Sequence, residues 1–182
     1  IPGSLVGSEM CIRDSGGTLP DEVHMILSEV LDKYPESKFG VHFQNDNGCA
    51  VANSMVAVEL GVDHVQGTIN GYGERTGNAD LCTLIPNLSL KKSYETISED
   101  SLSKLTQIAN HIAELVNVAI DSRHPYVGSS AFTHKAGLHA SGMAKDNVLY
   151  EHIDSSKVGN FTRTTVSELS LIHISEPTRL PG

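Results

Sequence analysis

The chain has few cysteines, few basic residues and no long apolar run. Three cysteines occur among 182 residues, and their spacing matches neither a disulfide framework nor a zinc motif, which favours a reducing compartment. The 13 lysine and arginine residues are outnumbered by 22 aspartate and glutamate residues, giving a formal net charge of −9. No apolar run approaches the roughly 20 residues of a membrane-spanning helix. These absences predict a cytoplasmic protein that binds neither nucleic acid nor a membrane.

Two peptides near the ends of the chain resemble translations of a single sequencing adapter. Residues 169–179 spell LSLIHISEPTR, and residues 5–15 spell LVGSEMCIRDS. Consider the DNA that encodes the first peptide. Its complementary strand, translated in another reading frame, gives the second peptide. We therefore expect 1–15 and 169–182 to be artefacts that make few contacts with the rest. The genuine segment is then 16–168, an internal fragment of a longer protein.

Helical and strand-like segments alternate in the first half of the chain. One helix is expected to begin at Thr18, as N-cap, and to end at Tyr34-Pro35, and a second is expected over 50–60. Short strands are expected over 38–43 and 64–70. This order is typical of an α/β protein built from parallel βα units. The apolar residues that should form one buried face of the first helix are Val23, Ile26, Leu27, Val30 and Leu31.

The strand over 38–43 leads into a polar tip. His42 and Gln44 lie two positions apart and so share one face of the strand, and turn-forming residues follow at 45–48. Ligands in parallel α/β folds gather at the carboxyl ends of strands. From these residues alone, the pair is compatible with one edge of a metal site or with a satisfied polar pair.

A glycine-rich loop follows the second strand. Residues 71–81 spell GYGERTGNADL, in which Glu74 and Arg75 stand between glycines. The spacing is not that of a dinucleotide-binding fingerprint. The loop either brings polar groups towards a site or is a turn with a surface ion pair, and its spacing favours neither.

The second half of the chain has a different pattern. A capping box at Thr96-x-x-Glu99 and apolar periodicity over 102–119 predict a long amphipathic helix. Beyond it, His134 and His139 stand five residues apart among small residues. On a helix that spacing is about 140°, so both histidines cannot point into one site. One can act while the other packs.

Four motifs occur in an order that matches a known family. They are GGTLP at 16–20, HFQND with AVANS at 42–46 and 50–54, GYGERTGN at 71–78, and AFTHKAGLH at 131–139. Together they resemble the 2-isopropylmalate, homocitrate and citramalate synthase family. Within that family, residues 66–75 and 84–88 look most like citramalate synthases.

The resemblance implies a (β/α)8 TIM barrel followed by a small helical subdomain. Residues 16–92 then correspond to the C-terminal part of the barrel, and residues 93–168 to a linker helix and the subdomain. The family's catalytic arginine, one metal-binding aspartate and a glutamate would lie in strands that this segment lacks.

The resemblance also implies a reaction. Acetyl-CoA, as cosubstrate, adds through its methyl carbon to the keto group of a 2-oxo acid, with pyruvate giving citramalate, and the thioester is then hydrolysed. A divalent metal (Mg, Mn or Zn) polarises the carbonyl, and the parent protein is expected to be a homodimer. The alternatives are a 2-isopropylmalate or homocitrate synthase, a lyase of the same superfamily, and an inactive fragment. The segment 131–142 argues against the lyase.

Site residues carry over from the family one by one. His139 matches the subdomain base, Tyr150 a tyrosine near it, and His134 is a supporting residue. At the metal, the family has histidine where this chain has Gln44, an amide that suits Mg or Mn better than Zn. The expected metal ligands are His42, Gln44 and Asn78, and the expected active-site loop residues are Asn45, Asp46, Glu74 and Arg75.

Overall fold

The computed structural model describes residues 16–135 and 151–165, and these form two compact units. The first contains the described residues up to Ile97 together with His111–Val118, and the second contains Ser98–Asn110 and the described residues from Ala119 onwards. The two predicted adapter segments, and the predicted site residues His139 and Tyr150, lie outside the described residues. None of the described helices is long and apolar enough to cross a membrane.

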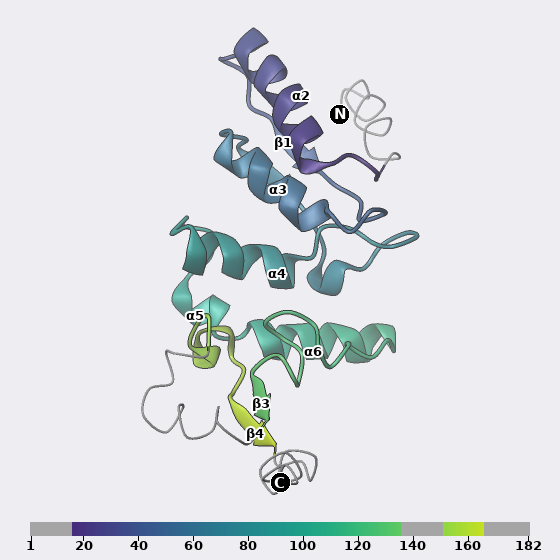
Figure 1. Cartoon of the computed structure of the whole chain (residues 1–182), viewed down its shortest axis with the longest axis vertical. Helices are drawn as coiled ribbons and strands as arrows, with labels where there is room; N and C mark the ends of the chain where they lie inside the picture. Colours follow the sequence, from purple (N-terminus) through teal and green to yellow (C-terminus); the bar gives the residue numbers. More distant parts are fainter. Residues whose placement is uncertain (1–15, 136–150, 166–182) are drawn as a thin grey trace, which may run out of the picture. The chain divides into compact units, whose positions relative to one another are not determined.

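The first unit begins with two βα repeats (Figure 1). Its elements are α2 (Pro20–Lys33), β1 (Gly40–His42), α3 (Ala50–Glu59), β2 (His64–Gln66), the short helix η1 (Ile69–Gly71), α4 (Leu81–Pro86) and η2 (Asn87–Lys91). β1 and β2 pair in parallel, with His42 opposite Gln66. α3 contacts α2 and both strands. The predicted order of parallel βα units is therefore confirmed.

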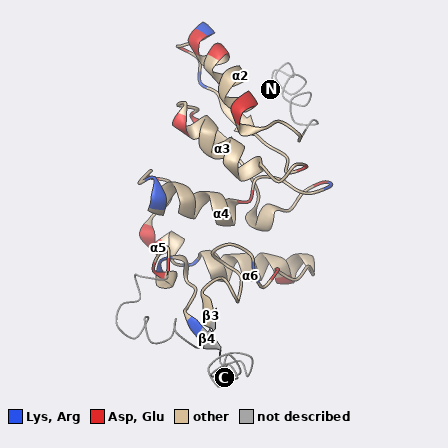
Figure 2. Cartoon of the chain, viewed as in Figure 1, with Lys and Arg blue, Asp and Glu red and all other residues tan. Residues whose placement is uncertain are grey.

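The ends of α2 follow local chemistry that differs in part from the prediction. The N-cap is Leu19 rather than Thr18, and the Glu22 carboxylate accepts a 2.8 Å hydrogen bond from the Leu19 backbone N–H. The helix ends at Tyr34, as expected. Asp21 and Glu22 lie in its first turn and Lys33 in its last, which suits the helix dipole; Figure 2 shows these charges at the two ends of α2.

The predicted buried face of α2 is only partly buried. Val23 is 3% exposed, but Ile26 is 51% exposed. The prediction is therefore wrong for Ile26. Periodicity identifies an apolar stripe but not what covers it, and α3, the helix that packs against α2, covers part of that stripe.

The predicted long helix is two helices. α5 (Glu99–Leu102) is followed by α6 (Leu105–Val116), and residues 103–104 separate them. The N-cap of α5 is Ser98, whose hydroxyl accepts a 3.2 Å hydrogen bond from the Ser101 N–H, so the predicted capping box at Thr96 is wrong. A serine directly before two acidic residues satisfies the first-turn N–H groups better than a threonine two positions earlier.

The second unit combines short helices with a strand pair. β3 (Thr133–Lys135) and β4 (Arg163–Thr165) are parallel, and η4 (Ser155–Val158) lies between them in sequence. The subdomain was expected to be helical, so this strand pair is a difference from the prediction. The buried apolar residues of the unit include Leu102, Leu105, Val127, Phe132 and Val158.

Asn160 joins two separate segments of the second unit. Its side chain is buried, and Nδ2 donates to the carbonyls of Tyr126 (2.9 Å) and Gly128 (3.0 Å), while Oδ1 accepts from the Phe161 N–H (2.8 Å). Each of these backbone groups would lose its partner if the amide were removed, and an unsatisfied buried polar group costs free energy.

Replacing Asn160 should therefore destabilise the second unit. We expect Asn160→Ala to lower the free energy of unfolding by about 2–4 kcal/mol, and Asn160→Asp to lower it further, since it places carboxylate oxygens beside two carbonyls. Urea unfolding followed by circular dichroism measures both. The control is Asn110→Ala, which removes one exposed hydrogen bond to Thr106. Equal losses in Asn160→Ala and Asn110→Ala would contradict the prediction.

Cys82 and Cys49 differ in their surroundings. Cys82 lies in α4 with no exposed surface, and burial raises the pKa of its thiol to about 12. Cys49 is half-buried at the start of α3. A thiol with a pKa of about 12 is ionised in roughly one molecule in ten thousand at pH 8.

Labelling should therefore distinguish the two thiols. In two single-cysteine variants, each with Cys11 replaced by serine, a disulfide reagent at pH 8 should label Cys49 readily and Cys82 at least about a hundredfold more slowly. Both should react alike in guanidinium chloride. Equal native labelling rates would show that α4 does not bury its cysteine.

Candidate functional site

The glycine-rich loop is pinned alongside the strand tip. Beyond β1, Gln44 and Asn78 form an isolated antiparallel bridge. The backbone N–H of Asn45 donates to the carbonyl of Gly77 (2.8 Å), and that of Ala79 donates to the carbonyl of Phe43 (3.0 Å). Residues 77–79 therefore run beside 43–45, and this pairing brings the loop to the carboxyl end of the strand.

Arg75 reaches from the loop to two acceptors on the tip. Its Nε lies 2.7 Å from Oδ1 of Asp46 and its Nη2 lies 3.1 Å from Oδ2, which makes a two-pronged ion pair. The same Nη2 also donates to Oε1 of Gln44. We call these three side chains the Arg75 clamp. The hydrogen bond from Arg75 holds the pKa of Asp46 below its usual range.

The clamp has features of both interpretations of the loop. Arg75 reaches the strand tip, where Gln44 is almost completely buried. Its ion pair with Asp46 is nevertheless at the surface, with the two side chains 44% and 26% exposed. That this loop serves a site therefore stays a prediction. Glu74 contributes its backbone carbonyl, which accepts from the Gly77 N–H (2.9 Å), and it is exposed.

Asparagine side chains fix the turn that follows the strand. The amide oxygen of Asn45 accepts a 3.2 Å hydrogen bond from the N–H of Ala50, the first residue of α3. Asn47 and Asn53 both donate to the carbonyl of Thr18, at 3.1 Å and 2.7 Å. Asn45, predicted as an active-site loop residue, therefore also holds the start of α3.

The expected metal ligands converge only in part. Asn78 donates through Nδ2 to the carbonyl of Tyr72 (3.0 Å), so Oδ1 is the atom of its amide that could bind a metal. His42 is half-buried at the end of β1. The oxygen of Gln44, however, accepts from Arg75. Within residues 16–135 and 151–165, no group of three or more His, Cys, Asp or Glu side chains is placed to hold a metal ion. The predicted set has two amides and one histidine, so it stays a prediction.

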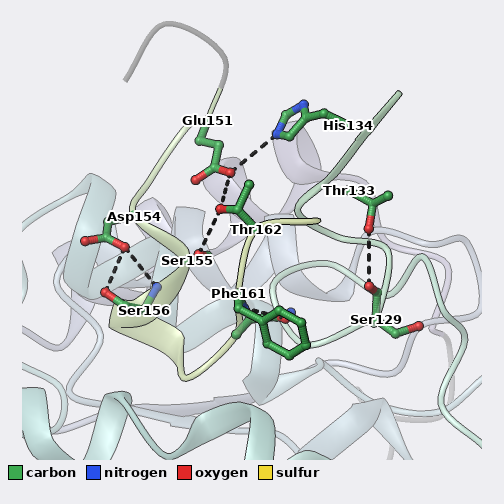
Figure 3. A network of polar contacts seen from close by, with 10 residues as sticks. Ser129, Thr133, His134, Glu151, Asp154, Ser155, Ser156, Phe161 and Thr162 are labelled. Atoms are coloured by element: carbon green, nitrogen blue, oxygen red, sulfur yellow. Dashed lines mark hydrogen bonds and ion pairs between the residues drawn. The ribbon is translucent and has the colours of Figure 1, made fainter. Parts of the chain in front are cut away.

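A second polar cluster lies in the second unit (Figure 3). Glu151, with its side chain 7% exposed, lies between His134 and Thr162. Its Oε1 is 3.4 Å from Nε2 of His134 and accepts a 2.5 Å hydrogen bond from the Thr162 hydroxyl, which in turn lies 3.3 Å from the Ser155 hydroxyl. His134 therefore faces a buried carboxylate.

Sequence reasoning did not identify Glu151 or Thr162. Glu151 directly follows Tyr150, a predicted site residue, and that adjacency was the available signal. The neighbouring His152 packs between aromatic rings, 5.2 Å from Tyr126 and 5.9 Å from Phe132, measured between ring centroids.

Two family models match the chain. The HMGL-like model covers residues 8–112, and the model for the homocitrate synthase post-HMGL domain covers residues 126–170. The (R)-citramalate synthase of Aquifex aeolicus is 49% identical over 86% of this chain and 30% of that protein. The chain belongs to the HMGL-like family. It lies among the citramalate and 2-isopropylmalate synthases, as the four motifs predicted.

Other members of the HMGL-like family are more distant. A 2-isopropylmalate synthase from Buchnera aphidicola is 34% identical over 79% of this chain and 30% of that protein. Among solved structures, this chain resembles an HMG-CoA lyase from Acinetobacter baumannii in complex with coenzyme A and 3-methylmalate. The sequences are 25% identical, and the TM-score is 0.50 over 58% of this chain and 35% of that one. The chain spans about 30% of the length of the curated relatives it matches.

Gly77 and Gly61 provide a matched test of the loop geometry. Both have positive φ, +89° and +98°. A Cβ on Gly77 would lie 1.9 Å from the carbonyl oxygen of Gly71, whereas a Cβ on Gly61 would meet nothing within 4 Å. That Gly71 carbonyl accepts the 3.0 Å hydrogen bond from the Asn78 N–H.

Alanine should therefore be tolerated at one glycine and not at the other. We expect Gly61→Ala to cost about 1–2 kcal/mol of unfolding free energy, from backbone strain alone. Gly77→Ala should cost at least about 3 kcal/mol, since it also displaces the Gly71 carbonyl and with it Asn78. Urea unfolding measures both, and equal costs would mean that the loop can move away from the strand tip.

Proposed function

We propose that this chain is part of an acyltransferase that condenses acetyl-CoA with pyruvate to give citramalate and CoA. The supporting observation is the difference in identity: 49% to an (R)-citramalate synthase against 34% to a 2-isopropylmalate synthase, over similar shares of the chain. The loop spelled GYGERTGN, whose Arg75 reaches the strand tip, is one of the segments that carries the resemblance.

The proposed reaction has two bond-forming steps. A base removes a proton from the acetyl methyl group, and that carbon bonds to the keto carbon of pyruvate, whose oxygen takes up a proton. Water then cleaves the thioester, releasing the CoA thiol and a second carboxylate. His139 is the proposed base, with Tyr150 beside it and His134 as support. His134 faces the buried carboxylate of Glu151, whose Oε1 lies 3.4 Å from its Nε2.

A divalent metal stays a prediction for the whole protein. When bound, such an ion would polarise the keto group of the oxo acid as a Lewis acid. Among the described residues, His42 and the oxygen of Asn78 are the candidate ligands, while the oxygen of Gln44 accepts from Arg75. No step of the proposed reaction is therefore assigned to the metal. A (β/α)8 barrel, a cytoplasmic location and a homodimer are further proposals, drawn from the resemblance.

The lyase alternative has less support. Lyases of the same family include a structural neighbour of this chain, but residues 126–170 match the homocitrate synthase post-HMGL domain. The pair of His134 with Glu151 lies within that match. A synthase that uses another 2-oxo acid is the closer competitor, as the relative from Buchnera aphidicola illustrates.

Substrate choice tests the proposal directly. The complete open reading frame, expressed and assayed for free CoA thiol, should use pyruvate with a kcat/KM at least about tenfold above those for 2-oxoisovalerate and 2-oxoglutarate. His139→Gln should lower kcat by about a hundredfold or more if that residue is the base. A preference for either of the other oxo acids would replace the citramalate assignment, and cleavage of HMG-CoA would favour the lyase.

A matched measurement on the present chain serves as the baseline. The chain of 182 residues should release no CoA above background, since the arginine, aspartate and glutamate that the family resemblance requires are not among its motifs. Turnover by this chain would mean that its own residues suffice.

A further inference from the structure

Chemistry fixes which end of the Gln44 amide faces Arg75. A guanidinium carries only donors, so the atom that it contacts must be the amide oxygen, Oε1. That oxygen is also the only atom of the side chain that could bind a hard cation. The oxygen has two lone pairs, so a cation could share it with Arg75 only by lying directly beside the guanidinium.

The surroundings of Gln44 favour the guanidinium over such a cation. Arg75 is held in place by two further bonds to Asp46, at 2.7 Å and 3.1 Å, so it cannot swing away without losing an ion pair. A divalent ion on the same oxygen would stand within a few ångströms of the guanidinium, and like charges at that separation repel. Gln44 is only 9% exposed, but the Arg75 side chain is 44% exposed and paired with Asp46, so solvent and the Asp46 carboxylate weaken that repulsion without removing it.

The position of Gln44 in the backbone gives its contact with Arg75 a wider effect. Gln44 is bridged to Asn78, and the chain between Arg75 and Asn78 includes the tight turn at Gly77. The hydrogen bond between Gln44 and Arg75 therefore also fixes the position of the loop that carries Asn78.

We propose that Gln44 is a positioning residue, which holds Arg75 and the loop of Asn78 at the strand tip, and is not a metal ligand. This inference is independent of the proposed reaction, since it concerns a contact that exists without substrate. If the protein does not make citramalate, the Arg75 clamp can still be present. If the protein does make citramalate, experiments can still show that the clamp is absent.

A mutant cycle in EDTA tests the clamp. Gln44→Met removes the acceptor at similar volume and should lower the melting temperature by about 3–6 °C, while Gln44→Glu, which can still accept from Arg75, should restore it. In an Arg75→Met background, Gln44→Met should have no further effect, since the partner is already gone. If Arg75→Met does not fold, the comparison of Gln44→Met with Gln44→Glu still decides.

A metal titration tests the other half of the inference. Binding of manganese ions, followed by the loss of the free-ion signal in electron paramagnetic resonance, should be the same within twofold for the unaltered chain and Gln44→Met. Gln44→His should bind manganese more tightly, because an imidazole is a good ligand and a poorer partner for Arg75. The proposal is overturned if Gln44→Met leaves the melting temperature unchanged in EDTA, or if it weakens manganese binding tenfold or more.

Discussion

The pairing of residues 77–79 with residues 43–45 is the constraint on which the tip of the first unit depends. Two backbone hydrogen bonds, from Asn45 to Gly77 and from Ala79 to Phe43, form the bridge between Gln44 and Asn78 and fold the glycine-rich loop against the end of the strand. Only then can the guanidinium of Arg75 reach Asp46 from 29 positions away in the sequence. Backbone pairing thus comes first, and the charged contacts add specificity to it.

Much of the first unit could be predicted because its signals are local. Apolar periodicity located α2, a run rich in small residues and closed by Gly61 located α3, turn residues located the end of β1, and the alternation of helix and strand predicted the parallel pair. Local signals gave the wrong residue where two neighbouring residues could each serve as the N-cap of a helix. Thr18 and Leu19 are both placed to cap α2, and the reach of the Glu22 carboxylate to the Leu19 N–H decides in favour of Leu19. No glycine or proline marks the break between α5 and α6.

The candidate site was predictable only as far as the family resemblance extends. The four motifs named Gln44, Asn78 and Arg75, but neither their spacing nor their identity indicated that Arg75 would contact Gln44, since that contact joins residues 31 positions apart. In the second unit, no sequence signal marks Glu151 as buried, because glutamate side chains are ordinarily solvated. Its burial and its contact with His134 depend on the folding of two separate segments.

The two-stranded parallel sheet of β1 and β2 has a consequence for how the chain behaves in solution. Among the described residues, each strand has one neighbouring strand, so each has one edge without a strand partner. Parallel sheets are ordinarily covered on both faces and extended by further strands. Two strands are also too few to be stable as a sheet alone. A concentrated solution of this chain will therefore tend to self-associate through strand edges, and charged residues introduced along those edges are the natural remedy.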